Sequence, residues 1–139
     1  MYKRSLILGL ISGVLSGLAS VIYQHVYNAA VGADFSNIVT IVSIIAASTF
    51  GCLLASIGYV LFNRWFKTNA DRVFNLVFVA FCILTIVSPF AFKLPLTVQS
   101  PELFPGMTIP MHLFAPLAWL TLHPFFFGKA PKLYTPADN

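Results

Sequence analysis

Apolar residues along this chain gather in four blocks that polar stretches separate. The blocks span residues 5–26, 38–62, 73–92 and 109–127, and none of them contains Asp, Glu, Lys or Arg. Because an α-helix rises about 1.5 Å per residue, a block of about 20 residues crosses the roughly 30 Å hydrocarbon core of a bilayer. The pattern predicts an all-α protein in which residues 1–139 form a single domain of four transmembrane helices.

The amino-acid composition agrees with lipid as the surrounding solvent. Of the 139 residues, 58% are hydrophobic and 9% are charged, whereas soluble domains have about 25% charged residues. A water-soluble fold of this composition would have too few polar side chains to cover its surface. We therefore expect the lipid bilayer to surround the outer face of the helices.

The basic residues indicate how the helices are oriented. Seven of the eight lie before the first block, between the second and third, or after the fourth; only Lys93 lies elsewhere. Lys and Arg in short loops stay on the cytoplasmic side of a membrane, so we expect an antiparallel four-helix bundle with both termini in the cytoplasm. The seven residues are Lys3, Arg4, Arg64, Lys67, Arg72, Lys129 and Lys132.

The first block has a second interpretation. Lys3 and Arg4 precede an apolar stretch that leads into the small residues 17–20, as in a cleavable secretory signal. We interpret it as an uncleaved span because the apolar residues continue to Val26 and the glycine spacing suits helix packing.

Small residues recur every fourth position in the first two blocks. Residues at this spacing share one face of a helix, and a face of small residues lets another backbone approach closely. The two rows can pack against each other, or one of them can face outward and contact another protein. The predicted packing residues are Gly9, Gly13 and Gly17 in the first block and Ser43, Ala47, Gly51 and Ala55 in the second.

Two histidines are the candidate cofactor ligands. His25 ends the first block and His112 opens the fourth, so both are expected near the outer face of the membrane. Two imidazoles on neighbouring helices are what a bis-histidine haem or a transition metal requires. The alternative is that each ring hydrogen-bonds to a loop or a lipid headgroup. The two cysteines, Cys52 and Cys82, are expected at similar depth, either as small apolar residues or as a disulfide or metal site.

Several function classes find little support in the sequence. The basic residues are dispersed in short connectors, so the net charge of +4 does not indicate nucleic-acid binding. The blocks lack the carboxylate and ammonium side chains that an ion-coupled transporter normally places in its spans, and no catalytic motif is present, so we expect no enzyme. A channel or carrier for a neutral solute stays open, with a path along Ser12, Ser16, Asn75 and Thr85.

A resemblance rests on three features: the basic N-terminus before Gly9, Gly13 and Gly17, the polar turn from Lys67 to Arg72, and the late step Met111, His112, Leu113. Together they resemble an uncharacterised family of small four-span bacterial membrane proteins, over nearly the whole chain. The resemblance implies a bacterial inner membrane and implies no activity or catalytic residue.

These observations favour a non-enzymatic membrane protein, an accessory or structural subunit that acts through helix contacts with other membrane subunits or with copies of itself. The alternatives are an electron-transfer subunit that binds haem or a metal through His25 and His112, and the channel or carrier for a neutral solute.

Overall fold

The computed structural model describes residues 1–66, 69–95, 97–98 and 100–128. Within these ranges the chain is helical and contains no strand, which confirms the predicted all-α class. The elements are α1 (Tyr2–Val31), α2 (Ile41–Trp65), α3 (Ala70–Thr85), α4 (Ser88–Ala91), the short 3-10 helix η1 (Pro101–Leu103) and α5 (Phe104–Phe127).

The described residues contain four helical segments that are long and apolar enough to cross a membrane, as the block pattern predicted. Their bounds differ from the predicted blocks. The first segment continues to Val31, where Gly32 closes the helix in the left-handed conformation (φ 68°). The second begins at Ile41, after Thr40 accepts a hydrogen bond from the backbone of Ser43. The last includes η1 and runs from Pro101 to Phe127.

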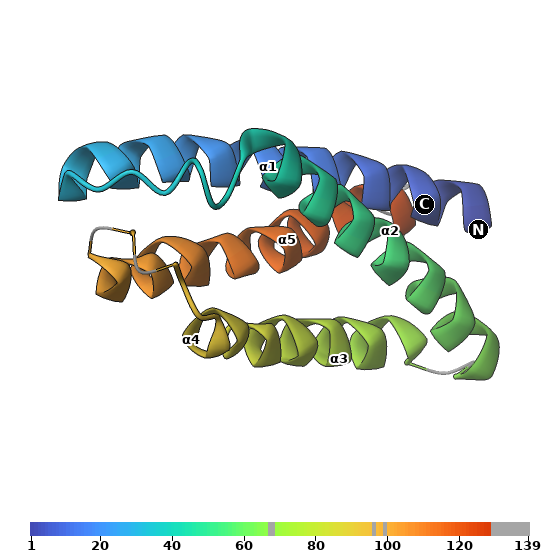
Figure 1. Ribbon diagram of the computed structural model, residues 1–139. Coiled ribbons are helices and arrows are strands. Elements are labelled where there is room, and N and C mark those ends of the chain that lie inside the picture. The colour runs from blue at the N-terminus through green and yellow to red at the C-terminus, as the bar shows by residue number, and fades with distance from the viewer. Residues whose placement is uncertain (67–68, 96, 99, 129–139) are drawn as a thin grey trace, which may run out of the picture.

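Helix α1 contacts both α2 and α5, and α3 contacts α2 and α5 (Figure 1). In this view α5 lies between α1 and α3, and α2 runs obliquely from α1 toward the start of α3. We call the two ends of the bundle the Met1 end, where Met1 lies near Asn63, Asp71 and Phe127, and the Gly32 end.

The glycine row of α1 lies against the backbone of α2. A Cβ atom on Gly13 would lie 2.5 Å from the Cα of Thr49, and one on Gly17 would lie 3.1 Å from the Cα of Ile45. A Cβ atom on Gly9 would overlap the Ser56 hydroxyl. Real Cβ atoms do not approach a backbone at the Gly13 distance, so only glycine permits this contact.

Two serines add hydrogen bonds to the α1–α2 contact. The Ser5 hydroxyl donates to the Ser56 carbonyl (3.0 Å), and the Ser56 hydroxyl lies 2.9 Å from the Ser5 carbonyl and 2.9 Å from that of Cys52. Ser5 and Ser56 are both fully buried. Polar side chains between apolar helices are stable when they bond in this way.

The predicted row on α2 is not the face that packs on α1, so of the two alternatives the structure agrees with the one in which a row faces outward. Ser43, Ala47 and Gly51 are exposed, and a Cβ atom on Gly51 would meet nothing within 4 Å. Only Ala55 of that row is buried. The reason is that the polar residues Ser56 and Tyr59 must face inward, and residues at spacings of three and four from them share their side of the helix. The α2 face that meets α1 consists of Ile45, Ser48, Thr49, Cys52 and Ser56.

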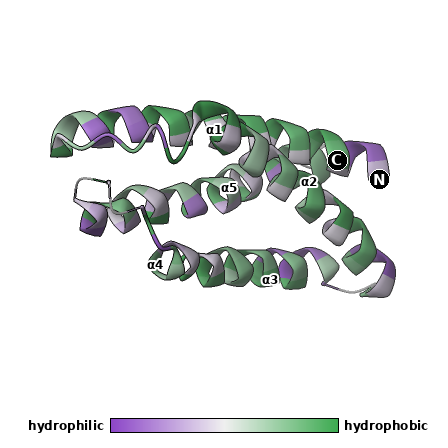
Figure 2. Ribbon diagram, in the orientation of Figure 1, coloured by the Kyte–Doolittle hydropathy of each residue, from purple (hydrophilic) through white to green (hydrophobic). Residues whose placement is uncertain are grey.

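The long helices consist mainly of hydrophobic residues (Figure 2), and many of the large apolar ones are exposed on their outer faces. Large side chains point outward from every long helix, with exposed fractions such as 77% for Val42, 72% for Leu76 and 83% for Phe125. Apart from Leu8, the buried positions on α1 are instead small or polar, namely Gly, Ser and Gln24. This reverses the arrangement of a water-soluble helical protein.

The connectors at the Gly32 end pack back onto the bundle. Phe35, Phe104 and Met107 form a buried cluster there with Ala33. Leu94 and Val98, from the segment between α4 and η1, pack against that cluster. The described part of this segment therefore covers the start of α5.

The close contact at Gly13 yields the first prediction. Gly13→Leu should separate α1 from α2, with a loss of stability at the upper end of the roughly 1–3 kcal/mol typical of overpacking, because the atom it meets is backbone and cannot move aside. Thermal unfolding in detergent measures the loss. Reaction of Cys52, which is fully buried beside this contact, with a thiol dye measures the opening.

Ala80→Leu is the control, since it adds the same side chain at an exposed position of α3. It should keep the wild-type melting temperature and a protected Cys52. Equal destabilisation by the two substitutions would contradict the assigned contact.

Candidate functional site

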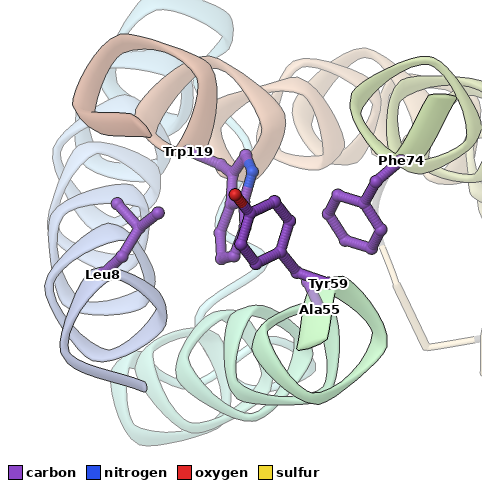
Figure 3. Packing of buried hydrophobic residues seen from close by; sticks show 5 residues of the cluster. All are labelled: Leu8, Ala55, Tyr59, Phe74 and Trp119. Carbon is purple, nitrogen blue, oxygen red and sulfur yellow. The ribbon is translucent and has the colours of Figure 1, made fainter. Parts of the chain in front are cut away.

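A cluster of aromatic and polar side chains occupies the bundle interior toward the Met1 end. Tyr59 of α2 lies at its centre and is 1% exposed. Figure 3 shows Tyr59 beside Phe74 of α3 and Trp119 of α5, with Leu8 of α1 on the other side of Trp119. The ring centroid of Tyr59 lies 5.3 Å from that of Phe74 and 6.0 Å from that of Trp119, both edge to face.

Hydrogen bonds join the helices of this cluster. The Tyr59 hydroxyl donates to Oδ1 of Asp71 at 2.7 Å, and the indole nitrogen of Trp119 donates to Oδ1 of Asn75 at 3.3 Å. The first bond joins α2 to α3 and the second joins α5 to α3. Asp71 therefore accepts from Tyr59, and Asn69, which precedes α3, makes no capping bond with its side chain.

His123 lies in the same cluster without a polar partner. It is 9% exposed, and its ring centroid lies 5.3 Å from that of Tyr59 and 5.1 Å from that of Phe127. Nε2 of His123 is a buried atom with no hydrogen-bond partner in the described residues. A cavity of about 320 Å³ adjoins the cluster, and Arg4, Tyr59, Asn63 and Asp71 line it.

At the other end, tyrosines of α1 donate to carbonyls of η1 and α5. Tyr23 donates to the carbonyl of Gly106 at 3.1 Å, and Tyr27 donates to that of Leu103 at 2.8 Å. Gly106 precedes Pro110 by four residues, and proline has no amide hydrogen to give. Tyr23 thus replaces the helical donor that Pro110 cannot supply. Gln24, 1% exposed, donates to the Val39 carbonyl just before α2 (2.6 Å).

Asp34 organises the loop that follows α1. Its carboxylate accepts from the side-chain amide of Asn28 (3.2 Å) and from the backbone N–H of Ser36 (2.8 Å). The Ser36 backbone donor lowers the pKa of Asp34 below its ordinary value, because the bond favours the charged form. The charged carboxylate therefore stabilises the loop above that pKa, and this stabilisation is lost as the pH falls through the pKa.

The two predicted cofactor ligands occupy different surroundings. His25 is exposed on α1, and the adjacent Gln24 points inward. Successive helical residues lie about 100° apart, which turns His25 away from the side that Gln24 occupies. His112 is half-buried on α5 and bonds to Thr85 of α3. The described contacts do not join the two rings, so a shared haem stays a prediction that this geometry does not favour.

The hydrogen bonds of Thr85 determine which ring nitrogen of His112 carries the hydrogen. The Thr85 hydroxyl lies 2.6 Å from the Cys82 carbonyl and 3.2 Å from Nδ1 of His112. Two oxygens at 2.6 Å need a hydrogen between them, and a hydroxyl has only one. Thr85 therefore donates to Cys82 and accepts from Nδ1–H. In the neutral ring this leaves Nε2 with a free lone pair.

Two cavities of about 280 Å³ each adjoin His112. They share Val39, Thr108 and His112 on their walls. One extends toward Ser20 of α1 and Ser43 of α2, and the other toward Phe92 after α4. We call the two together the His112 cleft.

The residues predicted for a solute path are dispersed. Ser16 bonds to the Gly13 carbonyl, Asn75 accepts from Trp119, and Thr85 bonds to Cys82 and His112. Ser12 is fully buried without a hydrogen-bond partner for its hydroxyl in the described residues. The solute path stays a prediction without a continuous polar route in the described part of the chain.

Cys52 and Cys82 are both buried free thiols. Within the described residues no group of three His, Cys, Asp or Glu side chains lies close enough together to hold a metal ion.

Comparison with known proteins finds no matching family model, and no similar curated protein or solved structure.

The cluster around Tyr59 was missed by sequence reasoning, although a signal for it exists. Three helices each carry two members of the cluster one helical turn apart, toward the Met1 end of each helix. Residues at i and i+4 share a helix face, so such pairs at one depth indicate a common polar site. The pairs are Tyr59 and Asn63, Asp71 and Asn75, and Trp119 and His123.

The bond between Tyr59 and Asp71 yields the second prediction. Tyr59→Phe keeps the ring and removes the hydroxyl, so it should lower the free energy of unfolding by about 1 kcal/mol. Thermal unfolding in detergent measures the change. Tyr2→Phe, at a tyrosine that is 54% exposed, should change it little, and equal effects of the two would show that the bond contributes nothing.

Proposed function

We propose that this protein is a small non-enzymatic membrane subunit that binds another transmembrane helix along α2. In this proposal it crosses the bilayer four times as an antiparallel bundle with both termini in the cytoplasm. The apolar exterior and the positions of the basic residues support the membrane placement. A bacterial inner membrane is part of the proposal and comes from the resemblance of the sequence.

The observation that carries the proposal is the unused small-residue face of α2. Ser43, Ala47 and Gly51 are exposed at a spacing of four, so they share one side of the helix. Elsewhere the outward faces carry large aliphatic and aromatic side chains, as on α3, where Leu76, Phe81 and Leu84 are exposed. Leucine would shield the backbone from lipid at least as well as these small residues do. Small residues on a transmembrane helix are instead typical of faces that approach another helix closely.

The internal packing strengthens this interpretation. The glycine row of α1 packs against a different face of α2. The face with Ser43, Ala47 and Gly51 is therefore left over after the bundle is complete. The partner is a transmembrane helix, supplied either by a second copy of this chain or by another membrane subunit.

The third prediction tests this face directly. Gly51→Leu should weaken association by about tenfold or more, because overpacking a helix contact costs about 1–3 kcal/mol. The assembly state in nanodiscs measures self-association. Affinity purification from the native host in mild detergent, followed by mass spectrometry, measures association with another subunit.

Ala80→Leu is the matched control, since Ala80 is an exposed small residue on α3. It should leave the association unchanged. Full association of Gly51→Leu, or an equal loss in Ala80→Leu, would reject α2 as the contact face. A wild-type protein that is monomeric and purifies without a stoichiometric companion would reject the function itself.

A further inference from the structure

The His112 cleft is rich in hydrogen-bond acceptors. A hydroxyl has one hydrogen to donate, and three hydroxyls on the cleft walls already use theirs within their own segments. Ser20 donates to the Ser16 carbonyl (2.8 Å), Ser43 to that of Thr40 (2.7 Å) and Thr108 to that of Phe104 (3.1 Å). These three groups offer the cleft only lone pairs.

Nε2 of His112 is the strongest of these acceptors. The bond of Nδ1–H to Thr85 holds the ring and leaves the lone pair on Nε2. This nitrogen makes no hydrogen bond to the described residues, and it is not among their buried unpaired atoms. It is therefore accessible to a ligand. An imidazole that donates through one nitrogen and accepts through the other is a fixed acceptor for a ligand hydrogen.

The remaining walls select an apolar ring. Ile44, Met111 and Val39 line one side of the cleft, and Phe92, Phe104 and Pro89 line the other. Aromatic and thioether side chains favour contact with an aromatic ring. Each cavity, at about 280 Å³, has the size of the smaller pockets that hold organic ligands.

We propose that the His112 cleft binds a lipid-soluble phenol or hydroquinone, whose hydroxyl donates to Nε2 of His112 while its ring lies against the apolar walls. A phenolic hydroxyl, with a pKa near 10, is more acidic than an aliphatic alcohol and so a better donor to imidazole. Ser48 and Ser88, whose hydroxyls are free of hydrogen bonds within the described residues, can bond to a second oxygen on the ring.

The bilayer supplies the route to this site. Ile41, Val42 and Phe92 beside the cleft are 46%, 77% and 58% exposed, so acyl chains would surround its flanks. This route rests on the membrane placement proposed above, whereas the binding itself can be measured in detergent and does not depend on α2 meeting a partner helix.

The fourth prediction compares two probes that differ in the donor. In micelles, para-propylphenol should bind the wild-type protein roughly tenfold more tightly than its methyl ether, after correction for partition into detergent, because the ether leaves Nε2 without a hydrogen bond. Titration followed by NMR of protein labelled with ¹⁵N-histidine measures both affinities. The phenol should shift the Nε2 resonance of His112 and leave Nδ1 protonated.

Variants separate the acceptor from the cavity. His112→Phe should abolish the preference for the phenol, and His25→Phe, at an exposed histidine, should keep it. Thr85→Val should reduce the preference, because Nδ1–H loses the acceptor that fixes the tautomer, and Thr85→Ser should restore it. If His112→Phe does not fold, the wild-type resonances and the Thr85 pair decide the question.

Three results would overturn the proposal: equal affinity for the phenol and the ether, a preference that persists in folded His112→Phe, or no binding of either probe. Ser43 and Ala47 belong both to the cleft and to the small-residue face of α2, whereas Gly51 belongs to that face alone and does not line the cleft. Gly51→Leu, which should weaken the helix contact and leaves the cleft lining unchanged, should keep the preference for the phenol, so the two proposals can fail separately.

Discussion

Polar groups in the helices of this protein find many of their partners inside the protein, and the structure depends on this constraint. Ser5 and Ser56 bond to each other's backbone, Gln24 bonds to the Val39 carbonyl, and Tyr59 bonds to Asp71. The outer faces of the long helices offer mainly aliphatic and aromatic carbon. Such a distribution suits a solvent that neither donates nor accepts hydrogen bonds, which is the property of acyl chains.

The constraint explains why α1 packs against both α2 and α5. In lipid there is no hydrophobic driving force that buries apolar side chains between helices, so helices associate through close packing and through polar groups. Helix α1 provides both, since glycines admit the backbone of α2 and serines and Gln24 bond across the contact. The tyrosines of its last turns do the same for α5, where Tyr23 bonds to the carbonyl that Pro110 leaves free. A proline-interrupted helix is thereby held beside a regular one.

Much of this architecture follows from local features of the sequence, and those features were predictable. Four apolar blocks give four helices, and a glycine at every fourth position gives one close face, because both depend only on helix geometry. The sequence left open whether Ser43, Ala47 and Gly51 face α1 or outward, since the inward face of α2 is decided by what Ser56 and Tyr59 contact on other helices. The depth of His25 was inferred without its rotation about the helix axis, which the inward Gln24 determines. The acceptor at His112 depends on Thr85 of another helix, and a single sequence does not indicate that pairing.

Two features of the bundle are not used by its internal contacts. The small-residue face of α2 and the acceptors of the His112 cleft are what remains after the internal contacts are made. Both features support a functional proposal only if acyl chains surround the protein, because water would otherwise bond to the acceptors and favour a different packing. The membrane placement is therefore the claim on which the functional proposals stand.

Cysteine labelling tests that placement most directly. In a background with Cys52→Ala and Cys82→Ala, single cysteines replace the exposed residues Ser36 and Asn69, which lie between α1 and α2 and between α2 and α3. The account predicts that a membrane-impermeant thiol reagent labels Ser36→Cys in intact spheroplasts and labels Asn69→Cys only after the membrane is permeabilised. Equal labelling of both positions in intact spheroplasts, or recovery of the protein in the soluble fraction without detergent, would contradict it.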